Sequence, residues 1–348
     1  MTESARMRGS RHGYLEVARS LATGGDATWL RRMLDFADAR LDLSDHRLLI
    51  ALKLVLEGGD ALPAGLRSDI DATLTGFRYW MDEPGSDSMC FWSESHYAVF
   101  AVCEYFAGHL LPDATFTNDG RSGTRKKARG EARLKAWLGD RFRWGFSEWL
   151  SSSYFEVNVC ALTLVADYAE EPLATQASMV LDLVMLDLAL HRLDGRFIAS
   201  AGRAYTTQKT TPARAEVNEI LASAFGESPT FHPDDLSGIF LDRVRYRVPE
   251  AIRDIAASRG AHTIKSSQGL DLDEVAGQVA LHHSAEGITG LHEALVRQYW
   301  GSEAFATAEA SATTQRAFKE YGLASNRFLA PLEPFTRLPA RMGLTTII

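Results

Sequence analysis

The chain alternates between stretches that are apolar on one side and stretches that are apolar nearly all round. Residues 63–81 and 124–140 place apolar side chains on one face at helical spacing, as in a helix with one face in water. Residues 91–111 and 155–169 are apolar on nearly every face, which indicates helices that are covered on all sides. Strand patterns are nearly absent before residue 195. The pattern therefore predicts an all-α protein.

More helices are predicted before and after these four. Helical spacing recurs in Tyr14–Leu21, Trp29–Leu41, His46–Glu57, 173–193, 214–225, 234–242, 249–258 and 272–283. The alternation itself, at a spacing of roughly 60 residues, is typical of helical hairpins packed in two layers. Such hairpins can close into a ring, an (α/α) toroid, whose covered helices form the inner layer. An ordinary helical bundle gives a weaker version of the same pattern. We expect a toroid, or an incomplete toroid with long loops.

The composition of the chain changes after residue 195. Residues 195–216 are polar and rich in Ala, Gly and Thr, with short β-type pieces at Arg196–Ala199 and Ala204–Thr207. This is a long loop, and long loops in compact domains are often functional. We expect a single helical domain over residues 1–348, in which about the last 60 residues are the least regular. The apolar ending without a turn signal is consistent with truncation of a longer chain.

Composition narrows the class of protein. The formal charge of the 348 residues is −8, which argues against a nucleic-acid binder. The basic residues of 121–135 are interpreted as the solvated face of a helix. Cys90, Cys103 and Cys160 lie in or beside apolar runs without C-x-x-C spacing, so we expect reduced core thiols and no zinc site.

The chain carries no visible targeting or membrane signal. Its N-terminus has no apolar stretch of the secretory type. The longest apolar run, residues 179–190, is short for a membrane span and contains Asp182 and Asp187. We therefore expect a cytoplasmic protein with no membrane and no nucleic-acid partner.

The two covered helices begin with similar groups of polar residues. The first reads Trp92-Ser93-Glu94-Ser95-His96, and the second carries Glu148 and Trp149, a serine run, then Tyr154, Glu156 and Asn158. Serine caps and first-turn carboxylates stabilise helix starts without any function. Capping does not explain His96 or Tyr154, nor Asn158, which shares a helix face with Tyr154. A shared ligand pocket at the two helix starts is the better explanation.

Aromatic residues concentrate in the same region. Five of the seven tryptophans fall between residues 80 and 149. Most aromatics in a helical protein are core residues, but sugar rings also stack on aromatic faces, and an apolar cavity with a few polar groups is the usual ligand site. The histidines and glutamates at His282, His283, Glu286, His292 and Glu293 match no standard metal spacing. From this spacing we expect no metal. No G-x-S-x-G, G-x-G-x-x-G or Walker A motif occurs, so we also expect no serine hydrolase of that type and no nucleotide cofactor, and we expect no cofactor at all.

Three segments resemble a known group of proteins. "MCFWSESH" with "VCEYFAGHLLPD", then "RFRWGFSEWLSSSYFEVN" and "FIASAGRAYT", resemble blocks of a group of largely uncharacterised bacterial proteins. The resemblance covers about residues 80–210, and the usual form of the group has Asn where this chain has Ser95. Its architecture is similar to the (α/α) toroids of carbohydrate-active enzymes, which include alginate- and heparin-degrading polysaccharide lyases and some glycoside hydrolases. The resemblance implies a fold, and a fold alone does not fix a function.

Two enzymatic hypotheses follow from the resemblance, both with a poly- or oligosaccharide as substrate. In a lyase, His96 and Tyr154 would be base and acid, while Arg203, Asn158 or a protonated Glu94 would hold a uronate carboxylate. In a hydrolase, two of Glu94, Glu148 and Glu156 would flank the scissile bond. Trp92, Trp149 and Tyr205 would bind the sugar. The lyase uses more of these residue types together and is favoured.

A third hypothesis is a protein without catalysis. A helical scaffold, or a carbohydrate-binding toroid that has lost its activity, would explain the departure at Ser95. The sequence does not indicate the oligomeric state.

Overall fold

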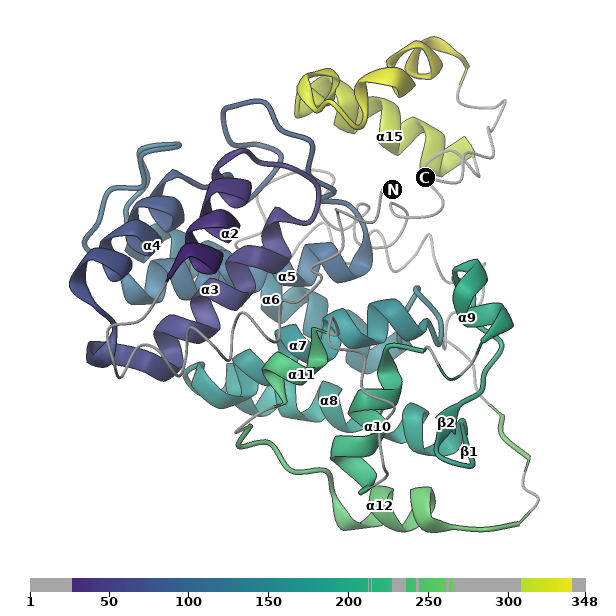
Figure 1. The fold of residues 1–348 in the computed structure, drawn as a ribbon. Helices are drawn as coiled ribbons and strands as arrows, with labels where there is room; N and C mark the ends of the chain where they lie inside the picture. Colours follow the sequence, from purple (N-terminus) through teal and green to yellow (C-terminus); the bar gives the residue numbers. More distant parts are fainter. Residues whose placement is uncertain are drawn as a thin grey trace. The chain divides into compact units, whose positions relative to one another are not determined.

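The computed structural model describes residues 27–211, 213, 215–226, 236–241, 244–260, 263–265 and 308–339 (Figure 1). Most of these residues are helical, which confirms the all-α class. The predicted helices at 14–21 and 272–283 lie outside the described residues.

The order of elements follows the predicted one closely up to residue 190. In chain order they are α2 Thr28–Asp38, α3 Ser44–Gly58, η2 Gly59–Ala61, α4 Ala64–Gly76, α5 Glu94–Leu110, α6 Gly123–Trp144, α7 Ser152–Tyr168, α8 Leu173–Leu190, β1 Arg192–Leu193, β2 Arg196–Phe197, α9 Thr206–Thr210, α10 Val217–Phe225, α11 Ser237–Phe240, α12 Glu250–Ala257, α15 Ala308–Glu320, η4 Leu323–Ser325 and η5 Ala330–Arg337. The helix predicted at 63–81 ends early, at Gly76. Beyond it, the backbone N–H of Tyr79 donates to the carboxylate of Glu83 at 2.9 Å, and this loop replaces the last predicted turn.

The described residues group into two compact units. Unit 1 holds those within Met1–Leu30, Lys53–Pro63 and Lys135–Gly269, and unit 2 those within Arg31–Leu52, Ala64–Leu134 and Leu270–Ile348. Helices α2, α3 and α6 contribute residues to both. The single domain expected over residues 1–348 stays a prediction.

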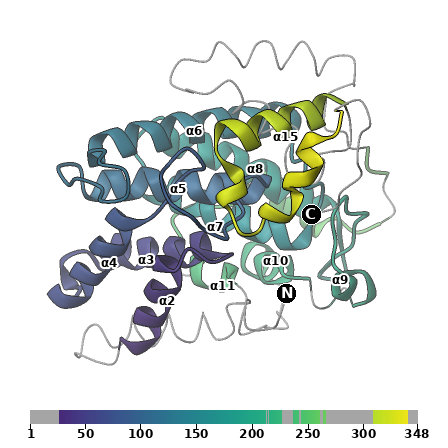
Figure 2. The same ribbon diagram turned by 90° about the horizontal axis from the view of Figure 1, so that it is seen from above.

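Unit 1 is built around α7 and α8, which pack along each other. Twelve of the 17 residues of α7 are buried, as expected for a helix that is apolar nearly all round. Helices α10 and α11 pack on α7 (Figures 1 and 2), and α12 packs on α8. The covered helix predicted at 155–169 is therefore confirmed.

Helix α8 is the one helix in the described part of the chain that could cross a membrane by length and composition. The helix is 18 residues long, whereas the apolar run noted in the sequence covers only residues 179–190 of it. Nine of its residues, including Val180, Leu181 and Leu188, are buried inside the protein, as in the core helix of a folded domain. The cytoplasmic location stays a prediction.

A short hairpin follows α8. Strands β1 and β2 pair antiparallel, and Asp194 and Gly195 between them both have positive φ, as a tight two-residue turn requires. The β-type piece predicted at Ala204–Thr207 is wrong, because Thr206–Thr210 forms α9. The side chain of Gln208 accepts a hydrogen bond from the backbone N–H of Tyr205 at 2.8 Å and thereby caps the start of this helix.

Unit 2 is built around α5, which has 15 of its 17 residues buried. Its backbone lies directly against that of α6 at two glycines, Gly108 and Gly130. A Cβ atom at Gly130 would lie only 2.7 Å from Cα of Tyr105 and 2.9 Å from the carbonyl oxygen of Ala101. The absence of a side chain at these positions therefore lets the two helices approach closely.

This close approach encloses a network of charges. Lys126 and Arg133 of α6 are buried, and Glu104 of α5 faces both, 3.8 Å from the ammonium and 3.0 Å from the guanidinium. Glu83 lies 2.6 Å from the ammonium of Lys126 and Asp119 lies 2.7 Å from it. The interpretation of residues 121–135 as a solvated face is thus wrong for these two cations, because acidic partners from three other segments pair with them inside the core.

Substitution of the contact glycine should show its importance. We expect Gly130→Ala to lower the free energy of unfolding by about 1–3 kcal/mol, because the added methyl group has to push two backbones apart. Gly139→Ala is the matched control on the same helix, where no atom lies within 4 Å of an added Cβ. That variant should gain up to about 1 kcal/mol from helix propensity. Urea denaturation of both variants measures the difference, and equal stabilities would contradict the packing.

Candidate functional site

A pair of tyrosines forms the first candidate site, within unit 1. Tyr154 lies in the first turn of α7, and Tyr205 immediately precedes α9. Their hydroxyl oxygens are 2.9 Å apart, so one phenol donates a hydrogen bond to the other. The guanidinium carbon of Arg203 lies 5.1 Å from the centre of the Tyr154 ring, within the range of a cation–π contact. Three residues predicted for the site therefore meet, and we call them the tyrosine cluster.

A second set of hydrogen bonds ties α9 to the start of α7. The hydroxyls of Ser152 and Ser153 donate to the carboxylate of Glu216 at 2.9 Å and 3.1 Å. The amide nitrogen of Gln208 donates to the same carboxylate at 2.7 Å and 2.9 Å. Because Gln208 also holds the backbone of Tyr205, this network fixes Tyr205 beside α7. The serines that were predicted as helix caps serve here as links to Glu216.

The electrostatics of the tyrosine cluster favour the protonated form of Tyr154. Burial raises the pKa of Tyr154 above its ordinary value, and its hydrogen bond with Tyr205 and the charge of Glu148 raise it further. Arg203 acts in the opposite direction but does not overcome these effects. Burial lowers the pKa of Arg203 itself, but the nearby Tyr154, Tyr205 and Glu148 outweigh it and raise that pKa. Arg203 is therefore positively charged beside Tyr154.

The other predicted residues of unit 1 lie in different surroundings. Glu148 and Trp149 are half-buried, and the carbonyl of Trp149 accepts a hydrogen bond from the N–H of Gly202 at 2.9 Å, just before Arg203. Asn158 is fully buried, and its amide makes no hydrogen bond among the described residues. Glu156 accepts a hydrogen bond from the backbone N–H of Ser237 at 2.8 Å, at the first residue of α11. Glu156 thus has a structural partner.

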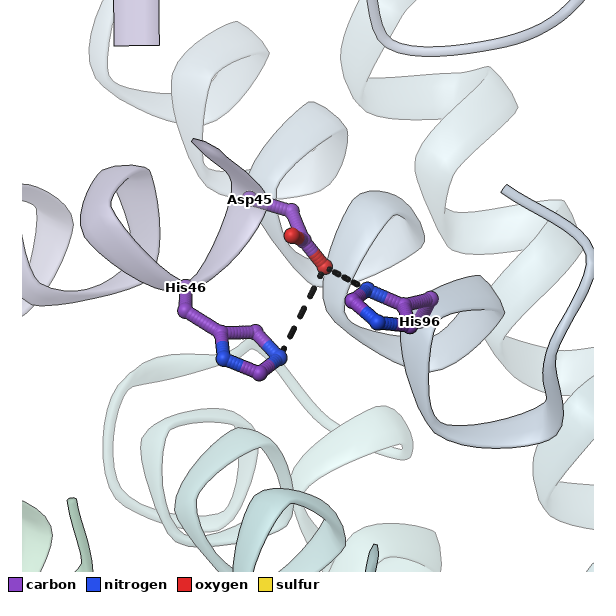
Figure 3. A group of neighbouring side chains, drawn as sticks. All are labelled: Asp45, His46 and His96. Atoms are coloured by element: carbon purple, nitrogen blue, oxygen red, sulfur yellow. Dashed lines mark hydrogen bonds and ion pairs between the residues drawn. The ribbon is translucent and has the colours of Figure 1, made fainter. Parts of the chain in front are cut away.

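A histidine pair forms the second candidate site, within unit 2. Nδ1 of His96, in the first turn of α5, lies 2.6 Å from Oδ2 of Asp45 (Figure 3). Nε2 of His46 lies 3.9 Å from the same oxygen. The two imidazole rings are nearly parallel, with centres 5.0 Å apart. One donor atom from each of these three residues lies within 4.8 Å of the others, and we call them the Asp–His cluster.

Burial controls the charges in the Asp–His cluster. It lowers the pKa of His46 to about 4, although Asp45 acts in the opposite direction, so this imidazole is neutral at neutral pH. Burial also opposes the ionised form of Asp45, but His96 and His46 outweigh it and lower the pKa of that carboxyl. The cluster at neutral pH therefore contains a carboxylate beside at least one neutral imidazole.

The residues around His96 hold the start of α5. Ser93 is the N-cap, and its hydroxyl accepts a hydrogen bond from the backbone N–H of His96 at 3.2 Å. Glu94 and Ser95 are buried beside it. Trp92 is also buried, with its ring 5.7 Å from that of Phe328. The cap predicted at this helix start is present, and the side chain of His96 reaches the carboxylate of Asp45.

Comparisons with protein-family models, with curated proteins and with solved structures found no match for this chain. The interpretation of both clusters therefore rests on their own geometry. The sequence predicted Trp92, Glu94 and His96, which lie in unit 2, and Glu148, Trp149, Tyr154, Glu156, Asn158, Arg203 and Tyr205, which lie in unit 1. Their roles in chemistry stay predictions.

Sequence reasoning missed four residues of these two sites. Asp45 and His46 precede His96 by about 50 positions, and only the acidic first turn after Ser44 marks them in the sequence. Gln208 and Glu216 lie in the polar loop that the sequence singled out as a whole, without indicating which of its side chains make contacts.

Proposed function

We propose that the chain is a carbohydrate-active lyase that cleaves uronate-containing poly- or oligosaccharides at the tyrosine cluster. The observation that carries this proposal is the hydrogen bond between Tyr154 and Tyr205 with the guanidinium of Arg203 over the ring of Tyr154. A phenol that can exchange a proton, next to a fixed cation, matches what elimination next to a carboxylate needs.

The chemistry is a β-elimination. A base takes the proton from the carbon next to the uronate carboxylate, and the electrons of the broken C–H bond form a carbon–carbon double bond. The bond from the neighbouring carbon to the glycosidic oxygen breaks, and that oxygen takes up a proton. A carboxylate that keeps its full negative charge makes the first proton too weakly acidic, so a cation has to pair with it. Arg203 supplies that cation.

Tyr154 can act as both base and acid in this proposal. Its phenolate would accept the proton from the sugar and then return it to the leaving oxygen on the same side. Tyr205 would stabilise the phenolate by donating a hydrogen bond to it, and the network of Ser153, Gln208 and Glu216 would keep Tyr205 in place. Trp149, next to this loop, offers an aromatic face for a sugar ring.

The proposed scaffold is an (α/α) toroid or an incomplete toroid, as the resemblance to carbohydrate-active enzymes implies. Its support is the alternation of burial along the chain. Helices α5 and α7 have 15 and 12 of their 17 residues buried, whereas α8 has 9 of 18 buried. Covered helices of this kind suit the inner layer of a toroid, and half-covered ones suit the outer layer.

No observation favours the two competing hypotheses to the same degree. Of the glutamates that a hydrolase would use, Glu156 is engaged with the first residue of α11. A non-catalytic carbohydrate-binding protein would not need a paired, protonated phenol under a cation.

Incubation of the purified protein with alginate, heparin and other uronate polymers tests the proposal. We expect an unsaturated product, followed by its ultraviolet absorbance, at a rate that rises about tenfold per pH unit above neutrality. The sign follows from the raised pKa of Tyr154: below that pKa the phenolate is a minor form, and each unit of pH increases its fraction tenfold. Sugar release without this absorbance would favour the hydrolase, and binding without any product would favour the non-catalytic protein.

A further inference from the structure

The Asp–His cluster has no task in the proposed elimination at the tyrosine cluster. It brings together a carboxylate and two imidazoles from the first turns of α3 and α5, two helices whose starts are about 50 residues apart in the sequence (Figure 3). The side chains of Asp45, His96 and His46 are only 1%, 10% and 12% exposed. Three titratable groups are thus placed together in an almost closed space.

One nitrogen in this cluster is unsatisfied. Nε2 of His46 is buried and makes no hydrogen bond among the described residues. Oδ2 of Asp45 lies 3.9 Å from it, which is too far for a hydrogen bond. A buried polar atom without a partner costs free energy, and in native proteins it often marks a place where a ligand or an ion binds.

The spacing of the donor atoms fits one small metal ion. Zinc lies about 2.0–2.1 Å from nitrogen and oxygen ligands, so two donors on one tetrahedral ion are about 3.3 Å apart. Oδ2 of Asp45 lies 2.6 Å from Nδ1 of His96, which is shorter than this separation, and 3.9 Å from Nε2 of His46, which is longer. Small rotations of the three side chains would bring all donors to equal distances from a shared centre.

The charges around the cluster also favour a cation. Among the described residues, Asp42 and Arg47 also interact with Asp45, and the formal charges of these two cancel. The carboxylate of Asp45 then leaves a net charge of −1 when both imidazoles are neutral. Neutral imidazole is the form that binds a metal ion, and a carboxylate beside two imidazoles supplies the negative charge that a cation needs.

We propose that Asp45, His46 and His96 bind one divalent transition-metal ion, with zinc as the best match. Two imidazoles and one carboxylate suit zinc and its neighbours in the first transition row, whereas calcium and magnesium prefer oxygen ligands alone. Three protein ligands leave a fourth position for water or another small ligand, as in zinc sites that react with substrates. The hydrogen bond from Cys103 to the backbone carbonyl of Asp45, at 3.7 Å, and the Ser93 cap on His96 hold the two helix starts in place.

The metal site is independent of the lyase proposal, and its test needs no substrate. The purified protein is treated with a chelator, dialysed, and titrated with zinc chloride in a calorimeter, and its metal content is then measured by mass spectrometry. His46→Ala and His96→Ala each remove one ligand. His109→Ala is the matched control, since His109 lies on α5 like His96 but stacks on Tyr105, away from the cluster.

We expect wild type and His109→Ala to bind about one zinc ion at this site, and His46→Ala and His96→Ala to lose at least about a hundredfold in affinity. Cobalt(II) is a second probe, because its visible absorption changes with the ligands, and magnesium should not compete. Should His46→Ala fail to fold by circular dichroism, His46→Gln replaces it with the same expectation. No zinc binding by wild type, or equal binding by the His46 variant and the control, would overturn the proposal.

Discussion

Replacement of Tyr154 by phenylalanine is expected to lower kcat for the proposed elimination by about a hundredfold or more, with a small change in KM. The phenolic oxygen is the atom that would move the proton, and a positioned acid or base typically contributes about 10²–10⁴-fold to a rate. The substitution removes one oxygen and keeps the ring under Arg203, so the fold should persist. Initial rates of unsaturated product formation on a uronate polymer measure the effect.

Tyr168→Phe is the matched control for this experiment. Tyr168 lies on the same helix α7, and the guanidinium of Arg245 lies 5.4 Å from the centre of its ring, much as Arg203 lies over Tyr154. This variant should keep the wild-type rate. Tyr205→Phe removes only the partner hydroxyl and should show an intermediate loss. A Tyr154→Phe variant that is folded and as active as the control would exclude Tyr154 as the proton-transfer residue.

Replacement of Lys126 by methionine is expected to lower the free energy of unfolding by about 3–5 kcal/mol. The ammonium of Lys126 is buried between the carboxylates of Glu83 and Asp119. Methionine leaves the buried Glu83 without its closest cation, whereas Asp119 keeps Arg121 at 2.6 Å. Such unpaired buried charge costs far more than the loss of a surface ion pair. Urea denaturation followed by circular dichroism measures the change.

Two further variants show whether charge is the cause. Arg125→Met removes an exposed cation next to Lys126 in the chain and should change stability by less than about 0.5 kcal/mol. Glu83→Gln in the Lys126→Met background removes part of the uncompensated charge and should recover part of the loss. If Lys126→Met were as stable as Arg125→Met, the buried network would not contribute to the fold.

Local patterns were sufficient to predict most of the helices. The starts of α5, α6, α7 and α8 were placed within three residues, because capping serines, prolines, glycines and apolar periodicity are properties of the nearby sequence. The same local reasoning failed for residues 121–135. It treated basic residues as solvent-facing, whereas Lys126 and Arg133 point into the core. Their partners Glu83 and Glu104 lie in other segments of the chain, which local patterns do not reveal.

The candidate sites were predictable only in part, for the same reason. Tyr154 and His96 were identifiable, because capping and core packing did not explain them. Their partners were not, since the pairing of Tyr154 with Tyr205 and of His96 with Asp45 depends on how separate helices pack. His46 offered no signal of its own, as a single histidine in the first turn of a helix is common. Its buried Nε2, which makes no hydrogen bond within the described part of the chain and lies beside Asp45, distinguishes it.

The masses of the products formed from a defined uronate oligosaccharide test the central claim most directly. Elimination divides the substrate without adding water, so the masses of the two products should sum to the mass of the substrate, and one product should carry a double bond next to its carboxylate. Hydrolysis would instead add one water molecule to that sum. Products of the first kind, absent with Tyr154→Phe, are what we predict for the tyrosine cluster; products that contain the added water would contradict it.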